Sequence, residues 1–124
     1  MAFFSKMVEK LARPPEEVRA ENVRDWASAL EGTVPIAGLA ARQRCKVAGV
    51  VQNIRIDPRP GRDSMEVTIT DGTGTMIAKW LGRQGMAGVQ LGIGLVVEGI
   101  VGEQGRDRMI LNPEYQLLPG PEAG

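Results

Sequence analysis

The stretch from Met65 to Trp80 constrains the fold of this chain more than any other segment. Residues 65–70 alternate apolar and polar side chains, the pattern of a β-strand with one buried and one wet face. A second short strand is expected at 75–81, and the residues between the two read Asp-Gly-Thr-Gly. These residue types favour a tight turn, so the segment predicts an antiparallel hairpin.

A long strand is expected before this hairpin, over Cys45–Asp57. The alternation of its apolar residues breaks at Ile54, which predicts a β-bulge near Gln52 and Asn53. Gly49 removes a side chain where the backbone bends or approaches a neighbour. Pro58–Ser64 is a loop by composition. One strand that bends in this way can serve both halves of a curled sheet.

Two more strands are expected after the hairpin, at Leu95–Gly102 and Arg108–Leu111, with Asn112 and Pro113 ending the regular pairing. The stretch 82–94 contains five glycines and predicts a short helical turn with loops. Five strands with a helical pause after the third are the layout of the OB-fold. The predicted fold class is therefore all-β: a five-stranded Greek-key OB-fold barrel, with a short helix between strands three and four.

The first 35 residues predict a helical extension ahead of the barrel. A short helical turn is expected at Lys6–Leu11, and Pro14-Pro15 followed by two glutamates suits the start of a second helix. Apolar residues then recur at helical spacing: Val18, Val23, Trp26, Ala27 and Leu30. The predicted division is thus an extension at 1–35, an OB-fold domain at 36–118 and a disordered tail at 119–124.

Composition limits the classes of function. The sequence holds 15 Lys and Arg against 15 Asp and Glu, which argues against a strongly basic, charge-driven DNA-binding protein. Any nucleic-acid site must therefore come from local clustering. No apolar run approaches the length of a membrane helix, and a single cysteine excludes an internal disulfide. A cytoplasmic protein without a membrane partner is expected.

Catalysis is not expected from these residues. There is no histidine, no soft metal-ligand set and no Gly-Lys-Ser/Thr phosphate loop. The carboxylates of Asp57, Asp63, Glu66 and Asp71 lie near one hairpin, but a solvated sheet face with turn caps explains them better than a magnesium site. The expectation is a non-enzyme with no cofactor, no metal and no small-molecule substrate.

Three phrases carry a resemblance to a known family: Val-Thr-Ile-Thr-Asp-Gly-Thr-Gly at 67–74, Trp-Leu-Gly-Arg at 80–83 and Leu-Asn-Pro-Glu-Tyr at 111–115. Together they resemble the OB-fold family of the tRNA/helicase anticodon-binding type, which includes the wedge domains of RecG-like helicases. The chain is similar above all to small stand-alone actinobacterial OB-fold proteins. The resemblance covers about residues 44–118 and implies binding of nucleic acid.

Cations are expected on both loops that flank the binding face of an OB-fold. The candidates for contacting nucleic-acid phosphates are Arg55, Arg59, Arg62, Lys79, Arg83, Arg106 and Arg108. The alternative is scattered solubilising charge, paired with neighbouring carboxylates such as Asp57, Asp63, Glu66 and Asp107. The binding interpretation depends on the fold bringing the two loops together.

Aromatic residues add little to this face. Trp80 shares a strand face with Met76 and Ala78, so we expect it in the barrel core rather than stacked on a base. For Tyr115, stacking on a nucleotide and covering the barrel end both remain open. Asp71 is expected to cap its own turn, and Cys45 to be a small buried apolar residue.

Two functions compete. The first is a non-catalytic protein that binds single-stranded DNA or RNA by tracking its backbone with low sequence specificity. The second is a protein-interaction module that uses the barrel and the amphipathic N-terminal helix. Phe3 and Phe4 favour the second, because exposed aromatic residues mark interfaces.

Overall fold

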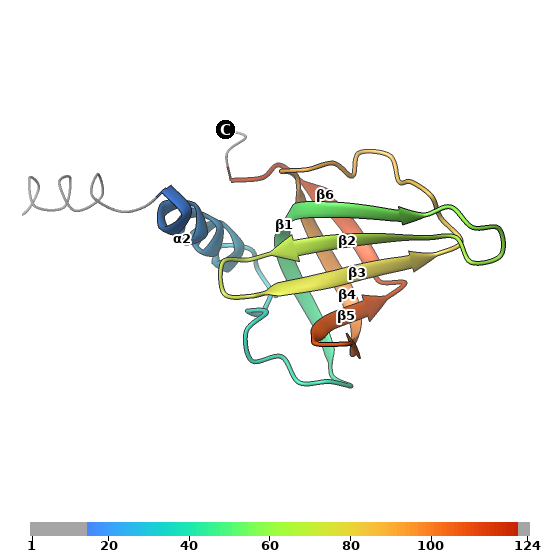
Figure 1. Cartoon of the computed structure of the whole chain (residues 1–124). Coiled ribbons are helices and arrows are strands. Elements are labelled where there is room, and N and C mark those ends of the chain that lie inside the picture. Colours follow the sequence, from blue (N-terminus) through green and yellow to red (C-terminus); the bar gives the residue numbers. More distant parts are fainter. Residues whose placement is uncertain (1–14, 122–124) are drawn as a thin grey trace, which may run out of the picture.

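The computed structural model describes residues 15–121, which form one helix and a strongly curved sheet (Figure 1). The elements in chain order are α2 (Pro15–Ser28), β1 (Arg44–Asp57), β2 (Ser64–Thr70), β3 (Thr75–Leu81), β4 (Gly94–Gln104), β5 (Asp107–Leu111) and β6 (Glu114–Leu118). The expectations for Phe3, Phe4 and Lys6–Leu11 lie outside the described residues, as do residues 122–124 of the predicted tail.

The strands form the predicted barrel. They pair in the order β1-β2-β3-β5-β4, and β1 also pairs with β4, so the sheet closes on itself. The β3–β5 pairing is parallel, whereas β1–β2, β2–β3, β4–β5 and β1–β4 are antiparallel. This is the order of a five-stranded Greek-key barrel, and the OB-fold prediction is confirmed.

The first strand serves both halves of the barrel, as expected. Residues 44–50 pair with β4 and residues 50–57 pair with β2, with a register shift between Val51 and Asn53. A Cβ on Gly49 would lie 2.9 Å from the Cβ of Ile69, so the glycine permits close approach of β2 where β1 bends. The predicted bulge and the predicted use of Gly49 are both confirmed.

The short helix predicted between the third and fourth strands is wrong. Residues 82–93 form turns and bends, and the φ angles of Gly82, Gly88 and Gly92 are all positive. A right-handed helix cannot include residues in this left-handed conformation, and glycine adopts it at little cost. Met86 alone in this segment is buried, where it packs on the core.

The chain also forms one strand more than the five expected. After Pro113, residues 114–118 pair with Gly94–Glu98 of β4 as strand β6. Polar and apolar residues alternate over 114–117, but Leu118 breaks the pattern and all five residues keep partial or full exposure. The alternating signal is therefore only four residues long, and it lies directly after the proline that was expected to end the regular pairing.

The core lies inside the barrel and follows the predicted strand faces. Met65, Val67 and Ile69 of β2 are buried, while the residues between them remain partly exposed. On β3 the inward side chains are Met76, Ala78 and Trp80, and Trp80 is 4% exposed. The expectation that Trp80 belongs to the core is confirmed.

Asn112 and Pro113 close the barrel where the parallel β3–β5 pairing ends. Asn112 has a φ of 49°, and its backbone N–H donates to the carbonyl of Lys79 at 2.6 Å. Its side-chain Oδ1 accepts from the N–H of Leu81 at 2.9 Å. Trp80 Nε1 donates to the carbonyl of Pro113 at 3.1 Å. The side chain of Asn112 thereby extends the β3–β5 hydrogen-bond ladder by one bond, beyond the point where the backbone of β5 leaves β3.

The helix α2 packs against one end of the barrel, beside the β2–β3 turn (Figure 1). Gly72 has a φ of +82°, and a Cβ there would collide with the carbonyl of Ala20 and with Cγ of Arg24. A Cβ on Gly94 would lie 2.5 Å from Cζ2 of Trp26. Two glycines thus make room for the helix, so part of its apolar stripe is covered by the barrel.

The described part of the chain ends against the same region. A Cβ on Gly120, a buried residue, would collide with the carbonyl of Gly92.

Within residues 15–121, no helix is long and apolar enough to cross a membrane.

We expect Asn112→Ala to lower the free energy of unfolding by about 1–3 kcal/mol. The variant loses the bond to Leu81 and forces a residue with a Cβ into the left-handed conformation. Asn112→Asp keeps an acceptor oxygen and tolerates positive φ, so it should lose less. Urea denaturation of the three proteins measures the difference, and equal loss in both variants would contradict this account of barrel closure.

Candidate nucleic-acid interface

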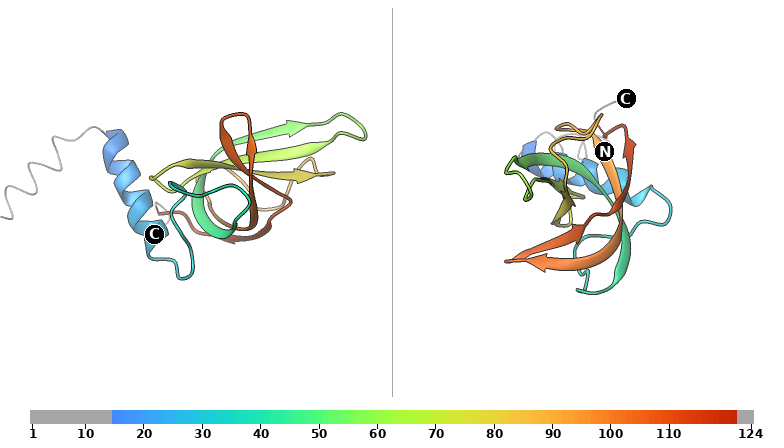
Figure 2. Two further views of the ribbon diagram at one scale, coloured as in Figure 1. Left: turned by 90° about the horizontal axis from the view of Figure 1, so that it is seen from below. Right: turned by 90° about the vertical axis from the view of Figure 1, so that its right-hand side faces the viewer.

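Two connections project from the same side of the barrel. They are the β1–β2 loop at residues 58–63 and the β4–β5 turn at residues 105–106. Both views of Figure 2 show them on one side, with the outer face of β2 and β3 between them. This is the arrangement that the predicted site required. We call the outer face of β2, β3 and β5, bounded by these two connections, the loop-flanked face.

Two of the predicted cations, Arg59 and Arg62, lie on the first loop, and a third, Arg55, lies near the end of β1 before it; all three are exposed. Arg59 is already engaged: its Nε and Nη2 donate to the carboxylate of Asp57, the shortest bond being 2.6 Å. The backbone N–H of Arg59 donates to the same carboxylate at 3.1 Å. These hydrogen bonds, with the charges of Arg59 and Arg62, lower the pKa of Asp57 to about 2.

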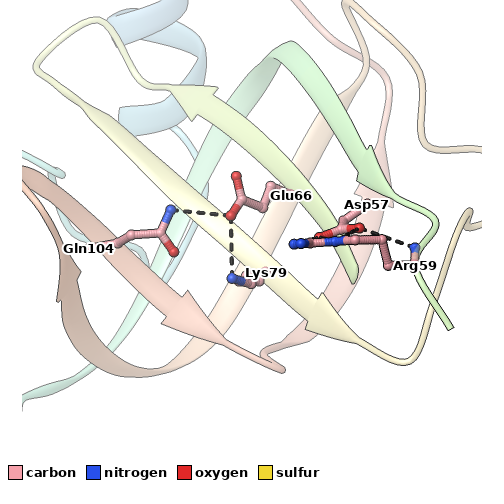
Figure 3. Close-up of polar contacts among 5 residues, drawn as sticks. All are labelled: Asp57, Arg59, Glu66, Lys79 and Gln104. Atoms are coloured by element: carbon pink, nitrogen blue, oxygen red, sulfur yellow. Dashed lines mark hydrogen bonds and ion pairs between the residues drawn. The ribbon is translucent and has the colours of Figure 1, made fainter. Parts of the chain in front are cut away.

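The centre of the loop-flanked face holds a smaller network, drawn in Figure 3. Lys79 Nζ lies 3.4 Å from Oε1 of Glu66 on the neighbouring strand. Gln104 Nε2, from the end of β4, donates to the same oxygen at 3.1 Å. Lys79 is therefore an ion-paired residue of the sheet face, and Gln104 ties the β4–β5 hairpin to β2.

The second connection carries Arg106 and Arg108. Arg106 is exposed, whereas Arg108 is half-buried and its Nε donates to the carbonyl of Leu39 at 3.3 Å. A shallow pocket of about 400 Å³ lies between this turn and the connector before β1. Arg108 thus fixes the turn, while Arg106 is presented to solvent.

Arg83 follows β3 directly and lies beside the first loop, because the N–H of Gly82 donates to the carbonyl of Asp63 at 2.8 Å. Within residues 15–121, no hydrogen bond or ion pair holds the side chains of Arg55, Arg62, Arg83 and Arg106. The seven predicted cations therefore divide into four presented to solvent and three, Arg59, Lys79 and Arg108, that are held by the protein.

Sequence reasoning missed the aliphatic side chains on the same face. Leu81 on β3 is 52% exposed and Leu111 on β5 is 48% exposed. Ile77, also on β3, is partly exposed. Leu111 is the register partner of Lys79, while the inward pair is Ala78 with Ile110. The parity of β3 could have identified Ile77 and Leu81, but Leu111 joins them only through the parallel pairing.

Tyr115 lies apart from this face. Its ring meets Trp80 edge-on, with ring centroids 5.6 Å apart, and the residue is 41% exposed. Because Trp80 points into the barrel, this contact places Tyr115 against the barrel end. Of the two roles expected for Tyr115, the contact with Trp80 fits covering of the barrel end.

Two residues weighed for chemistry have structural roles. One oxygen of Asp71 accepts from the N–H groups of Thr73 and Gly74 and from the Thr73 hydroxyl, which confirms the predicted turn cap. Its other oxygen accepts from the N–H of Ile36 at 2.8 Å. Cys45 is buried as expected, and burial, together with the charge of Glu98, raises the pKa of its thiol.

The remaining cavities offer no obvious reactive centre. A cleft of about 840 Å³ separates α2 from the barrel and includes the buried Asp71, whose oxygens are both occupied. No cluster of three or more potential metal ligands occurs among the residues that the structure describes. The arrangement as a whole can present separate positive groups on both sides of a partly aliphatic sheet face.

No protein-family model and no curated protein matches the sequence. Solved structures do match the fold. RecG bound to a three-way DNA junction aligns over 73% of this chain with 16% identity and a TM-score of 0.59. The chain corresponds to only 13% of the RecG chain.

Two further structures align in a similar way. A murine DNA-binding protein bound to double-stranded DNA covers 73% of this chain, and 49% of its own, with 18% identity and a TM-score of 0.58. The OB domain of a Methanosarcina mazei protein covers 74% of this chain, and 88% of its own, with 15% identity and a TM-score of 0.57. At such identities the likeness establishes the OB-fold and nothing further.

Arg59→Ala should raise the pKa of Asp57 from about 2 toward its ordinary value of 3.8, because the hydrogen-bonding guanidinium is removed. Because the pKa of Asp57 is lower in the folded state than in the unfolded state, its carboxylate stabilises the folded state above pH ~4. This contribution is lost as the pH falls toward 2. The wild type should therefore lose its stability advantage over the variant within that window. NMR titration of the carboxyl carbon and denaturation at two pH values measure both effects. Arg83→Ala is the control, and an unchanged Asp57 pKa in Arg59→Ala would contradict the assignment.

Proposed function

We propose that this protein binds a strand of DNA or RNA on the loop-flanked face, chiefly through the phosphate backbone and without catalysis of its own. The observation that carries the proposal is the placement of Arg62 and Arg106. They are exposed, no hydrogen bond or ion pair among the described residues holds their side chains, and they stand on the two connections that flank β2 and β3.

Arginine suits this task because its planar guanidinium donates two parallel hydrogen bonds to phosphate oxygens. Arg55 and Arg83 extend the positive edge along the first loop. Each phosphate neutralised releases counterions, so binding must weaken as salt rises. The net charge of zero implies modest affinity, because no long-range field of the whole protein assists association.

The preference for a single strand rests on the aliphatic residues. Ile77, Leu81 and Leu111 offer apolar surface to the faces of bases, which are exposed in a single strand and stacked on one another in a duplex. Aromatic stacking is not part of the proposal, because Trp80 is buried and Tyr115 lies at the barrel end. The two neighbours solved with DNA, RecG and the murine protein, support nucleic acid as the ligand class.

A protein partner is the second candidate function. The exposed Leu81 and Leu111 would suit the apolar surface of another protein as well as they suit bases. The amphipathic helix contributes less to this alternative than expected, because Trp26 packs over Gly94 of the barrel. A partner that is captured equally well by the wild type and by a variant lacking Arg62 and Arg106 would favour it.

The test is a titration of labelled single-stranded oligonucleotides at several salt concentrations. Arg62→Ala combined with Arg106→Ala should weaken binding about 10-fold or more at low salt. The slope of log affinity against log salt should fall by about 1 to 2, because two phosphate contacts are lost.

The matched control removes two arginines elsewhere, with Arg19→Ala on α2 and Arg44→Ala on β1. It has the same net charge and should leave affinity and salt slope nearly unchanged. No binding of the wild type at low salt, or equal losses in the two double variants, would overturn the proposal.

A further inference from the structure

The middle of the loop-flanked face carries an acidic side chain, which is unexpected where a polyanion is to bind. Glu66 lies on β2, directly opposite Arg55 of β1 and Lys79 of β3. Its side chain is 16% exposed, so it is held within the face rather than extended into solvent. A carboxylate in this place needs a reason beyond solubility.

The two oxygens of Glu66 are not equivalent. Oε1 receives both Lys79 Nζ at 3.4 Å and Gln104 Nε2 at 3.1 Å. No described residue donates a hydrogen bond to Oε2. Within residues 15–121, every buried side-chain oxygen has a hydrogen-bond partner, so Oε2, which has none, must be accessible to solvent. In Figure 3 this oxygen points away from the Lys79 and Gln104 nitrogens. The network therefore orients one free oxygen on the face.

An ionised carboxylate only accepts hydrogen bonds. It repels phosphate oxygens, and it also meets the carbonyl oxygens of thymine and uracil unfavourably. It pairs well with the exocyclic amino group of cytosine. The two flanking loops bear arginines that no hydrogen bond or ion pair holds. The arrangement therefore separates a path for phosphates along the loops from a central position for the edge of a base.

We infer that Glu66 Oε2 is a base-reading group that selects bases with an exocyclic amino donor, cytosine above all, over thymine and uracil. This inference rests on the proposed function and adds sequence preference to it. Lys79 and Gln104 act as positioning residues, because they hold Oε1 and so fix the direction of Oε2. The aliphatic side chains of Ile77 and Leu111 flank Lys79 and provide the surface for the ring of the base.

The experiment compares wild-type binding to oligo(dC) and oligo(dT) of equal length, at one low salt concentration. We expect oligo(dC) to bind at least 5-fold more tightly. Glu66→Met removes the acceptor and conserves the volume of the side chain, so the ratio of the two affinities should fall to below 2-fold. Absolute affinity for oligo(dT) should rise, because a negative charge leaves the face.

Glu98→Met is the matched control. Glu98 also lies in an ion pair, with Arg44 at 3.8 Å, but on the β1–β4 part of the barrel. This variant should keep the wild-type preference, and circular dichroism shows whether each variant is folded. Lys79→Met serves as a second variant: it removes one of the two groups that hold Oε1 and leaves the acceptor in place, so it should reduce the preference less than Glu66→Met.

The outcomes separate the two proposals. Salt-dependent binding with equal affinity for oligo(dC) and oligo(dT), or a preference that survives Glu66→Met, would overturn the role of Glu66 and leave the proposed function intact. Failure of the wild type to bind either oligonucleotide would overturn the proposed function itself. Loss of the preference in Glu98→Met to the same degree as in Glu66→Met would also contradict the inference.

Discussion

The parallel pairing of β3 with β5 is the constraint on which the rest of the structure depends. Its three register pairs join two halves of the chain that no hairpin connects. Asn112 extends this short ladder by accepting from the N–H of Leu81, and Trp80 donates to the carbonyl of the next residue, Pro113. This closure, together with the Gln104–Glu66 and Arg108–Leu39 hydrogen bonds, sets the position of the β4–β5 turn relative to β2 and so forms the loop-flanked face.

The two ends of the barrel are closed by different means. At one end, the carboxylate of Asp71 caps the β2–β3 turn and holds the connector at Ile36, while Gly72 lets α2 approach the turn. At the other end, Trp80 and Tyr115 meet edge-on. Apolar side chains and satisfied polar groups thus occupy both ends of the barrel.

A chain with no net charge can still present a positive edge if its acids are paired selectively. Asp57 holds Arg59, and Glu66 holds Lys79, whereas no hydrogen bond or ion pair among the described residues holds Arg62 or Arg106. The paired cations have structural roles. The Asp57–Arg59 pair holds the first loop, and the Glu66–Lys79 pair orients the free oxygen of Glu66. Local pairing, rather than net charge, therefore determines which positive groups this face presents to solvent.

The sequence by itself determined the first five strands, the bulge near Gln52, the inward face that carries Trp80 and the capping role of Asp71, because these follow from alternation and turn chemistry over a few residues. It could not determine that glycines at 82, 88 and 92 would adopt positive φ and exclude a helix, nor that residues 114–118 would pair as β6. Which arginines would be held and which left without partners was also decided by tertiary structure. Those contacts join residues up to 69 positions apart, as between Arg108 and Leu39, and local patterns carry no information on such distances.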